Sequence, residues 1–443
     1  MSGSAETGGL DATERAVLAE WRRRTSPTGL SVEYADFLHY LERYDPVGGE
    51  RELPPHRQQN HVAPYPLPLH TGGERLHENN ARILGMLLGG AMGDAIGRAV
   101  AATSFEETLE RLAAADSDAS TLQISENTQL ALFTAEGLIR AHTRLRRHGE
   151  DDALGAIRHA FQRWLHTQGV PWDDARTTDT PNTPDGWLVT ERRLFARRSS
   201  TATAMSACHR SSALERTGSP EEPINDARDA GALTRAALLS LYWEEKSGER
   251  LSWQEAGARH ADFAARAASL THGHPDGYLP AAAMALTARD LFSGHWLLRS
   301  TAVAADHLAT LEGHEPTVGV VAAARDLLRA TSHRLPVRQE LEDLADPTSA
   351  LGVLAISICV GNLHHDFESA MRMATDHSGD IVATATVTGQ LMGLEHGPAI
   401  VPASWWQALE LRDVVERMAL DLCAEFGPQA PDTPDWIDRY PIP

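Results

Sequence analysis

Apolar residues recur at helical spacing along most of the chain, where alanine is abundant and aromatic residues are few. Tyr34, Phe37, Leu38 and Leu41, for example, would share one face of a helix over residues 32–43. Apolar positions three and four residues apart form one face of a helix, whereas strands show strict alternation. The pattern therefore predicts an all-α protein.

The strongest apolar run, within residues 81–100, carries a glycine at every fourth position. Gly85, Gly89, Gly93 and Gly97 would lie on one stripe of a helix, where each costs roughly 1 kcal/mol relative to alanine. Close approach of another backbone or of a ligand would offset that cost. Asp94 lies beside the stripe, and a buried carboxylate needs a partner. We expect Asp94 either to bond neighbouring backbone or to take part in a ligand site.

Four oxygen-bearing residues, Ser125, Glu126, Asn127 and Thr128, directly precede the helical pattern of residues 129–133. Such side chains favour helix N-termini because they accept hydrogen bonds from free backbone N–H groups. Clustered oxygen donors also suit a hard cation such as Mg²⁺. From the residues alone, this quartet is either a helix cap or a metal site.

The two ends of the chain differ from its middle in composition. Residues 1–80 read as an N-terminal extension, with helices expected over 11–21 and 32–43 and then a linker rich in proline. This extension either packs as a cap or forms an arm that reaches a partner. Residues 81–426 form the main helical domain. The tail, residues 427–443, is rich in proline and acidic residues, so we expect it to be extended on the surface.

Charge and cysteine usage narrow the functional classes. The 443 residues carry 40 basic and 61 acidic side chains, and 40 − 61 gives a net charge of −21. Binding to nucleic acid is therefore not expected as a main role, whereas a basic partner would suit this surface. Cys208, Cys359 and Cys423 lie far apart, as in a protein of the reducing cytoplasm. No signal peptide is evident, and the apolar run 83–95 contains Asp94 and is too short to span a bilayer, so no membrane role is expected.

Several motifs occur in an order that one known family shares. Residues 87–97, Leu-Leu-Gly-Gly-Ala-Met-Gly-Asp-Ala-Ile-Gly, resemble a G-x-x-x-G-x-A-x-G-D-A-x-G helix, and residues 125–132 stand where that family has T-D-D-T-Q-M-A-L. Residues 270–275 match L-T-H-G-H-P, and residues 376–380 are similar to N-H-S-G-D. Together these motifs resemble the ADP-ribosylglycohydrolase family over about residues 80–425. The resemblance implies an orthogonal bundle of helices.

The same resemblance implies an activity and a set of site residues. The family cuts the glycosidic bond between ADP-ribose and an acceptor, using two Mg²⁺ ions in a cleft inside the helical bundle. Carried over, the metal ligands would be Ser125, Glu126, Asn127 and Asp380, of which Glu126 and Asp380 would be catalytic. The other ligand-binding positions would be Gly93, Asp94, Gly231, His272, Ser378 and Gly379.

Departures from the family pattern predict impaired or altered catalysis. Asn127 and Val382 stand where the family has aspartates, and Ala383 stands where it has a hydroxyl. The core carboxylates thus fall from four to two, Glu126 and Asp380, which would leave a two-ion site with a net charge of +2. A site without any metal is the main expectation, with a single Mg²⁺ or Ca²⁺ on Ser125, Glu126, Asn127 and Asp380 as the alternative.

The substrate-facing loops also depart from the family pattern. Residues 199–202 and 228–232 lose glycine or proline, which predicts weaker binding of a diphosphate. Three functions remain open. The first is a hydrolase with a reduced metal set. The second is an impaired relative that binds ADP-ribose, an ADP-ribosylated protein or small molecule, or another nucleoside-like ligand. The third is a protein-interaction role of the immunity type, with residues 1–80 as the contact element.

Overall fold

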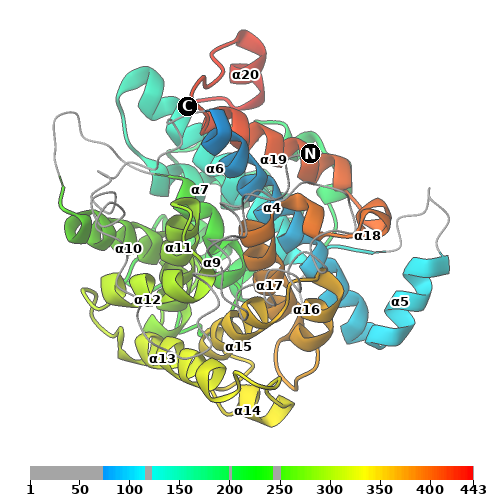
Figure 1. The fold of residues 1–443 in the computed structure, drawn as a ribbon. Coiled ribbons are helices and arrows are strands. Elements are labelled where there is room, and N and C mark those ends of the chain that lie inside the picture. Colours follow the sequence, from blue (N-terminus) through cyan, green and yellow to red (C-terminus); the bar gives the residue numbers. More distant parts are fainter. Residues whose placement is uncertain (1–72, 115–121, 199–201, 243–250, 443) are drawn as a thin grey trace, which may run out of the picture. The chain divides into compact units, whose positions relative to one another are not determined.

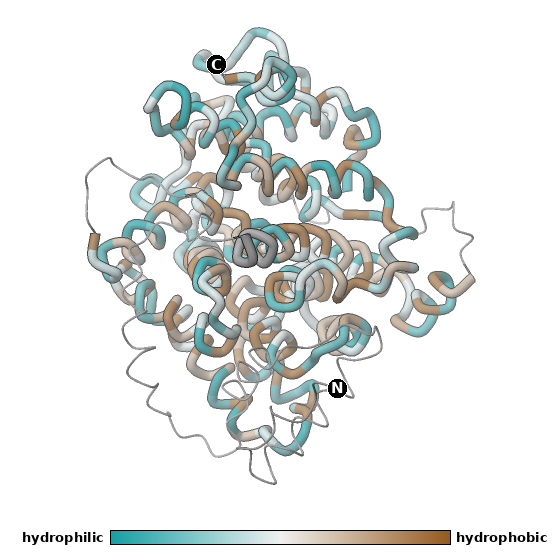
Figure 2. Tube along the Cα trace, turned by 45° about the horizontal axis from the view of Figure 1, so that its top comes forward, coloured by the Kyte–Doolittle hydropathy of each residue, from teal (hydrophilic) through white to brown (hydrophobic). Residues whose placement is uncertain are grey.

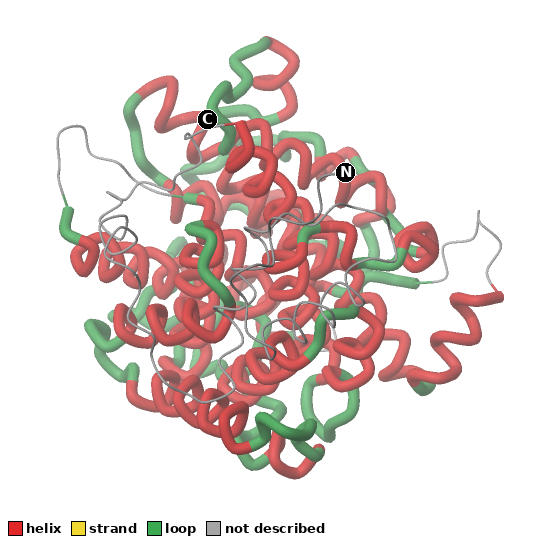
Figure 3. The backbone as a smooth tube through the Cα atoms, viewed as in Figure 1, coloured by secondary structure: helices red, strands yellow, loops and turns green. Residues whose placement is uncertain are grey.

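A computed structural model describes residues 73–114, 122–198, 202–242 and 251–442, with side chains from Asn79 onward, and its regular elements there are all helices (Figures 1 and 3). An isolated parallel bridge between Leu122 and Leu409 is the one β pairing in these ranges. The prediction of an all-α protein is therefore confirmed. The helices expected over 11–21 and 32–43, and the prolines of the linker, lie outside the described residues. Residues 73–80, which the sequence assigned to the extension, form the start of α4 instead.

The elements are named as in Figure 1. The α-helices are α4 (Gly73–Ala102), α5 (Phe105–Ala114), α6 (Glu126–His148), α7 (Ala153–Thr167), α8 (Trp172–Ala175), α9 (Thr203–Leu214), α10 (Trp253–Ser269), α11 (Pro275–Phe292), α12 (Leu297–Leu308), α13 (Glu315–Ala330), α14 (Arg338–Glu342), α15 (Ala350–Leu363), α16 (Phe367–Ala374), α17 (Ile381–His396), α18 (Ala403–Ala408), α19 (Arg412–Glu425) and α20 (Pro434–Arg439). The short 3-10 helices are η2 (Leu188–Thr190), η3 (Arg192–Leu194), η4 (Leu233–Leu241) and η5 (Pro398–Ile400).

The glycine stripe of α4 packs directly on α17, and this is the most extensive contact between two described helices (Figure 1). A Cβ atom added at Gly85 would lie 2.7 Å from the carbonyl carbon of Gly393, and one at Gly93 would lie 2.7 Å from that of Ala385. Because the order of the contacts reverses, the two helices are antiparallel. Close approach of another backbone, one of the two explanations offered by the sequence, therefore accounts for the glycines.

Helix α4 is a core helix. Its residues Asn79–Ala102 are long and apolar enough to cross a membrane by length and composition alone, but 72% of the most apolar window is buried inside the protein. Most of α15 is buried as well. Apolar segments run through the middle of the view in Figure 2, while many hydrophilic ones lie toward its margin. Burial within the protein thus explains the apolar character of α4.

The C-terminal segment is not the extended surface tail that its composition predicted. Thr433 caps α20 by accepting a hydrogen bond from the Trp436 N–H over 3.3 Å. Trp436 and Tyr440 are buried, and the Tyr440 hydroxyl donates to Asp421 over 2.7 Å. Most of the described tail residues lie at the surface, as expected, but residues 434–439 are helical and not extended, because two aromatic side chains give them enough apolar surface to dock.

Candidate functional site

Asp94 is fully buried and holds the start of α6 through four hydrogen bonds. The backbone N and the Oγ of Ser125 donate to its two carboxylate oxygens over 2.7 and 2.5 Å. The backbone N and the Oγ1 of Thr128 donate to one of these oxygens over 3.3 and 2.5 Å. Burial raises the pKa of Asp94, and the four hydrogen bonds act in the opposite direction. Asp94 thus bonds backbone, as one reading of the sequence expected, and also two hydroxyls.

The quartet that opens α6 is a helix cap. Ser125 is the N-cap residue, and its Oγ accepts a hydrogen bond from the Asn127 N–H over 3.0 Å. Asn127 uses its side-chain oxygen to accept from Thr234 Oγ1, the first turn of η4, over 3.2 Å. Glu126 is buried, with 7% of its surface exposed. Hydrogen bonds within the protein therefore fix the start of α6 and tie it to α4 and η4.

A second acid, Asp380, starts α17. Its carboxylate accepts from the Ala383 N–H over 2.9 Å, and its own N–H donates to the Pro347 carbonyl over 3.0 Å. Burial raises the pKa of Asp380; the bond from Ala383 opposes this, and the negative charge of Asp229 adds to it. The electrostatic influence of Asp229 places a further acid near this position.

Asp229 is a site residue that the motifs did not reveal. One of its oxygens accepts from His272 Nε2 over 2.8 Å and from the Gly231 N–H over 3.1 Å, and the other accepts from Thr203 Oγ1 over 2.7 Å. Burial alone would raise the pKa of Asp229, but these hydrogen bonds outweigh it and hold the pKa well below its usual range. The sequence carried one hint: residues 228–232 lose glycine relative to the family that the chain resembles, and position 229 carries an acid there.

The buried side chain of His272 holds the Asp229 carboxylate in position by a hydrogen bond. Its ring is fully buried, and burial lowers its pKa, while the hydrogen bond to Asp229 and the charge of Asp229 oppose that shift. Arg235 donates to Thr271 Oγ1, which lies within hydrogen-bonding distance of His272 Nδ1, at 2.8 Å. Because an ionised carboxylate can only accept a hydrogen bond, His272 Nε2 donates to Asp229 over 2.8 Å. A Cβ at Gly231 would lie 3.0 Å from the His272 ring, so close packing on this ring accounts for that glycine.

The first turns of α6, α9 and η4 meet at the loop 226–232, and Asp380 at the start of α17 lies within electrostatic reach of Asp229 in that loop. We call this group the candidate site. Gln390 of α17 donates to the Thr234 carbonyl over 2.5 Å. Cys208 of α9 lies near this group as well, since the charges of Arg235 and Glu126 act on its thiol. Burial raises the pKa of that thiol to about 12. The structure brings Glu126, Asn127, Asp380, Gly231 and His272 into this neighbourhood.

Two other residues named from the sequence have structural contacts of their own. The N–H of Ser378, an exposed residue, donates to Glu342 over 2.7 Å. A Cβ at Gly379 would overlap the Pro347 carbonyl, so the backbone there requires a glycine.

The residues of the candidate site do not match a two-metal centre. The hydroxyls of Ser125 and Thr128 donate to Asp94, and position 382 is a valine. Within the described ranges, no three His, Cys, Asp or Glu side chains come close enough to hold one metal ion. Two divalent ions need several carboxylates to offset their charge, and this neighbourhood does not supply them.

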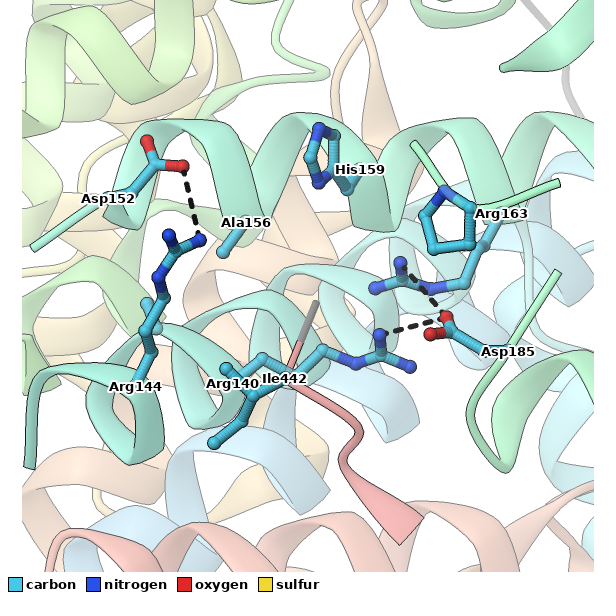
Figure 4. A pocket seen from close by; sticks show the side chains of 10 residues that line it. Arg140, Arg144, Asp152, Ala156, His159, Arg163, Asp185 and Ile442 are labelled. Atoms are coloured by element: carbon cyan, nitrogen blue, oxygen red, sulfur yellow. Dashed lines mark hydrogen bonds and ion pairs between the residues drawn. The ribbon is translucent and has the colours of Figure 1, made fainter. Parts of the chain in front are cut away.

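A separate pocket lies between α6 and α7 (Figure 4). Its volume of about 20 Å³ suits only about one water molecule. Arg140 and Arg163 both pair with the buried Glu136 and with Asp185, so the charges in its wall balance one another. Arg140 lies 14 residues beyond Glu126 on α6, which is roughly 20 Å along a helix. This pocket is therefore distinct from the candidate site.

Comparison with known proteins gives one family and a set of solved structures. The model of the ADP-ribosylglycohydrolase family matches residues 76–432. No curated protein matches the chain. One solved structure that resembles it is described as an ADP-ribosylglycohydrolase-related protein complex. That structure is 20% identical in sequence, with a TM-score of 0.47, and the alignment covers 78% of this chain and 98% of the other.

Proposed function

Since the chain belongs to the ADP-ribosylglycohydrolase family, we propose that it is a family protein in which hydrolysis of the glycosidic bond is impaired. The ligand we propose is ADP-ribose, an ADP-ribosylated protein or small molecule, or a related glycoside. The bundle of helices and the α4–α17 contact retain the scaffold, whereas the candidate site has lost charge.

The observation that carries this proposal is the first turn of α17. Asp380 is followed by Ile381, Val382 and Ala383, three side chains without an oxygen. The next hydroxyl, that of Thr384, is fully buried and donates to the Asp380 carbonyl over 2.9 Å. The Asp380 carboxylate itself accepts from the Ala383 N–H. This turn therefore offers one acid where the family resemblance implies two acids and a hydroxyl.

Charge supports the same conclusion. Glu126 and Asp380 together would leave two divalent ions with a net charge of +2, in a setting where solvation is poor. Asp229 adds a third negative charge nearby, but three hydrogen-bond donors already occupy its two oxygens. We therefore expect at most one Mg²⁺ at this place.

The proposal is tested by restoring the lost acids. The variant Asn127→Asp/Val382→Asp and the wild type are incubated with an ADP-ribosylated protein and Mg²⁺, and release of ADP-ribose is measured. Val382→Asn is the matched control, because it adds a polar side chain of the same shape without charge. We expect release above background from the double acid variant only. Substantial Mg²⁺-dependent release by the wild type would refute impaired catalysis.

A second measurement separates binding from turnover. Calorimetric titration of the wild type with ADP-ribose, with and without Mg²⁺, reports whether the site binds without metal. Binding that does not change with Mg²⁺ would favour a ligand-binding protein that does not hydrolyse. Binding that requires Mg²⁺ would favour a hydrolase with a reduced metal set.

A further inference from the structure

The buried side chain of Arg235, in η4, supports the Asp229 carboxylate by two routes. One of its nitrogens donates to the Gly231 carbonyl over 2.6 Å, and the Gly231 N–H in turn donates to Asp229 over 3.1 Å. Another nitrogen donates to Thr271 Oγ1, which lies 2.8 Å from His272 Nδ1. His272 Nε2 then donates to the same Asp229 oxygen over 2.8 Å. A change at Arg235 would therefore disturb both routes to one carboxylate.

Arg235 also brings positive charge to the candidate site. The acceptors of its two hydrogen bonds are neutral, and its guanidinium lies over the Phe161 ring, 4.9 Å from the ring centre. Burial lowers the pKa of Arg235 to about 10, so the group stays protonated at neutral pH, and the negative charges of Glu126 and Asp229 act on it. The charge of Asp229 is thus partly offset from inside the protein, so this site can also admit an anionic ligand.

The Asp229 carboxylate has room for one more hydrogen bond. An ionised carboxylate offers about four acceptor positions. One of its oxygens accepts from Gly231 and His272, whereas the other accepts, within the described residues, from Thr203 Oγ1 alone, over 2.7 Å. About 27% of the Asp229 side chain is exposed. A donor group of a ligand can therefore bind to this carboxylate.

The loop that carries Asp229 lies beside the residues that the family resemblance connects with the glycosidic bond. Thr234 Oγ1 lies 3.0 Å from the Gly231 carbonyl oxygen and 3.2 Å from the side-chain oxygen of Asn127 at the start of α6. The charge of Asp229 also acts on Asp380. The sugar that carries this bond is the terminal ribose of ADP-ribose, so this ribose is the part of the ligand nearest to Asp229.

We propose that Arg235 is a positioning residue, which holds the Asp229 carboxylate so that it accepts a hydrogen bond from a hydroxyl of the ligand's terminal ribose. This inference rests on the proposed function, since it concerns the ligand of the same site. An ionised diphosphate has no donor to offer Asp229, whereas each ribose hydroxyl has one. Because the acceptor is charged, the contact should strengthen binding by roughly tenfold.

The test compares ADP-ribose with ADP, which shares the adenosine and the diphosphate but lacks the terminal ribose. Calorimetric titration of the full chain at about 0.15 M salt gives both affinities, and their ratio is the readout, because a change in charge or folding acts on both ligands. The variants are Asp229→Asn, Arg235→Lys, Thr271→Val and the two double variants that combine Asp229→Asn with each of the others. Lysine keeps the charge but loses the fork that spans two acceptors, and valine keeps the shape of threonine without its hydroxyl.

The matched control is Thr287→Val in α11. Thr287 is buried like Thr271, but its hydroxyl donates within its own helix, to the Ala283 carbonyl over 2.8 Å. It lies roughly 18 Å along α11 from Pro275, so its variant reports the loss of a buried hydroxyl outside the candidate site.

We expect Asp229→Asn to lower the preference for ADP-ribose over ADP by roughly tenfold. Arg235→Lys and Thr271→Val should each lower it by at least about threefold, and neither should lower it further in the presence of Asp229→Asn, because both act through Asp229. Thr287→Val should leave the ratio within about twofold of the wild type. Either supporting variant is sufficient if the other does not fold.

The remaining outcomes separate this inference from the proposed function. An unchanged ratio in Asp229→Asn would overturn the contact with the ribose. Losses that add in the double variants would show that Arg235 and Thr271 do not act through Asp229, and would overturn the positioning role. Both results leave the proposed function standing. If the wild type binds neither ADP-ribose nor ADP, the proposed ligand class fails, and this inference fails with it.

Discussion

Replacing Gly85 by alanine should destabilise the protein, although alanine is the better helix former. The substitution adds one methyl group at the α4–α17 contact, far along α4 from Asp94. That methyl would lie 2.7 Å from the carbonyl carbon of Gly393 and 2.8 Å from that of Gly397, both of them backbone atoms. Ordinary contact for such a carbon begins at 3.4 Å, and the Gly393 carbonyl oxygen lies even closer than its carbon, so the helices must part by more than about 0.7 Å.

The expected change in the free energy of unfolding is the balance of two opposing effects, helix propensity and overpacking. Alanine gains about 1 kcal/mol of helix propensity over glycine in a helix interior. Overpacking of a well-packed contact costs about 1–3 kcal/mol, and the upper end applies because a backbone cannot move aside as a side chain does. We therefore expect the free energy of unfolding to fall by about 2 kcal/mol.

The matched control is Gly319→Ala in α13. A Cβ there would meet nothing within 4 Å, so helix propensity should act alone and stabilise the protein by about 0.5–1 kcal/mol. Gly393→Ala, which approaches Gly85 from the other side, should match Gly85→Ala, and the double variant should lose less than the sum because one helix shift relieves both clashes. The assay is urea denaturation followed by circular dichroism. A Gly85→Ala variant as stable as Gly319→Ala would refute the close packing of α4 on α17.

Two further predictions concern the buried acids. Asp94→Ala leaves the hydrogen-bond donors of Ser125 and Thr128 without their acceptor. It should lower the free energy of unfolding, measured by denaturant titration, by about 2–4 kcal/mol. A loss below about 1 kcal/mol would contradict the role of Asp94. The folded-state pKa of Asp229 lies below its unfolded value, so its contribution to stability is present above about pH 4 and is lost as pH falls through the folded pKa. The difference in unfolding temperature between the wild type and Asp229→Asn should therefore be largest near pH 7 and shrink below pH 4, and a difference that grows on acidification would contradict it.

Local rules predicted the features that depend on neighbours in sequence. The cap at Ser125 and the start of α6 follow from the preference of oxygen-bearing side chains for free N–H groups within the next few residues. The glycine stripe of α4 indicated a close contact because helical periodicity places those positions on one face. The identity of the contacting surface, the backbone of α17, lies about 300 residues away, and no local pattern could identify it.

The acid at position 229 was missed for the same physical reason. Its donors stand at positions 203, 231 and 272, and only folding brings them to one carboxylate. The sequence showed that the loop had lost glycine, but it did not show that the new side chain would be held ionised by a buried imidazole. The C-terminal tail gave the converse error: its composition suggested an extended surface segment, whereas the packing of Trp436 and Tyr440 decided its structure.

The α4–α17 contact depends on the size of its side chains and not on their charge, so it would tolerate the change in charge that the proposed function requires. The contact runs from Gly85 against Gly393 to Gly97, where an added Cβ would lie 2.8 Å from the Cα of Val382. This contact requires small side chains along the stripe of α4, and that requirement is steric and does not depend on charge. Asp94 and Asp380 stand beside that end of the contact, each bonded to the N-terminal N–H groups of a helix. Exchanging an acid and an uncharged residue at position 127 or 382 would change charge and leave the small residues of the stripe as they are, so ligand chemistry can vary on this scaffold.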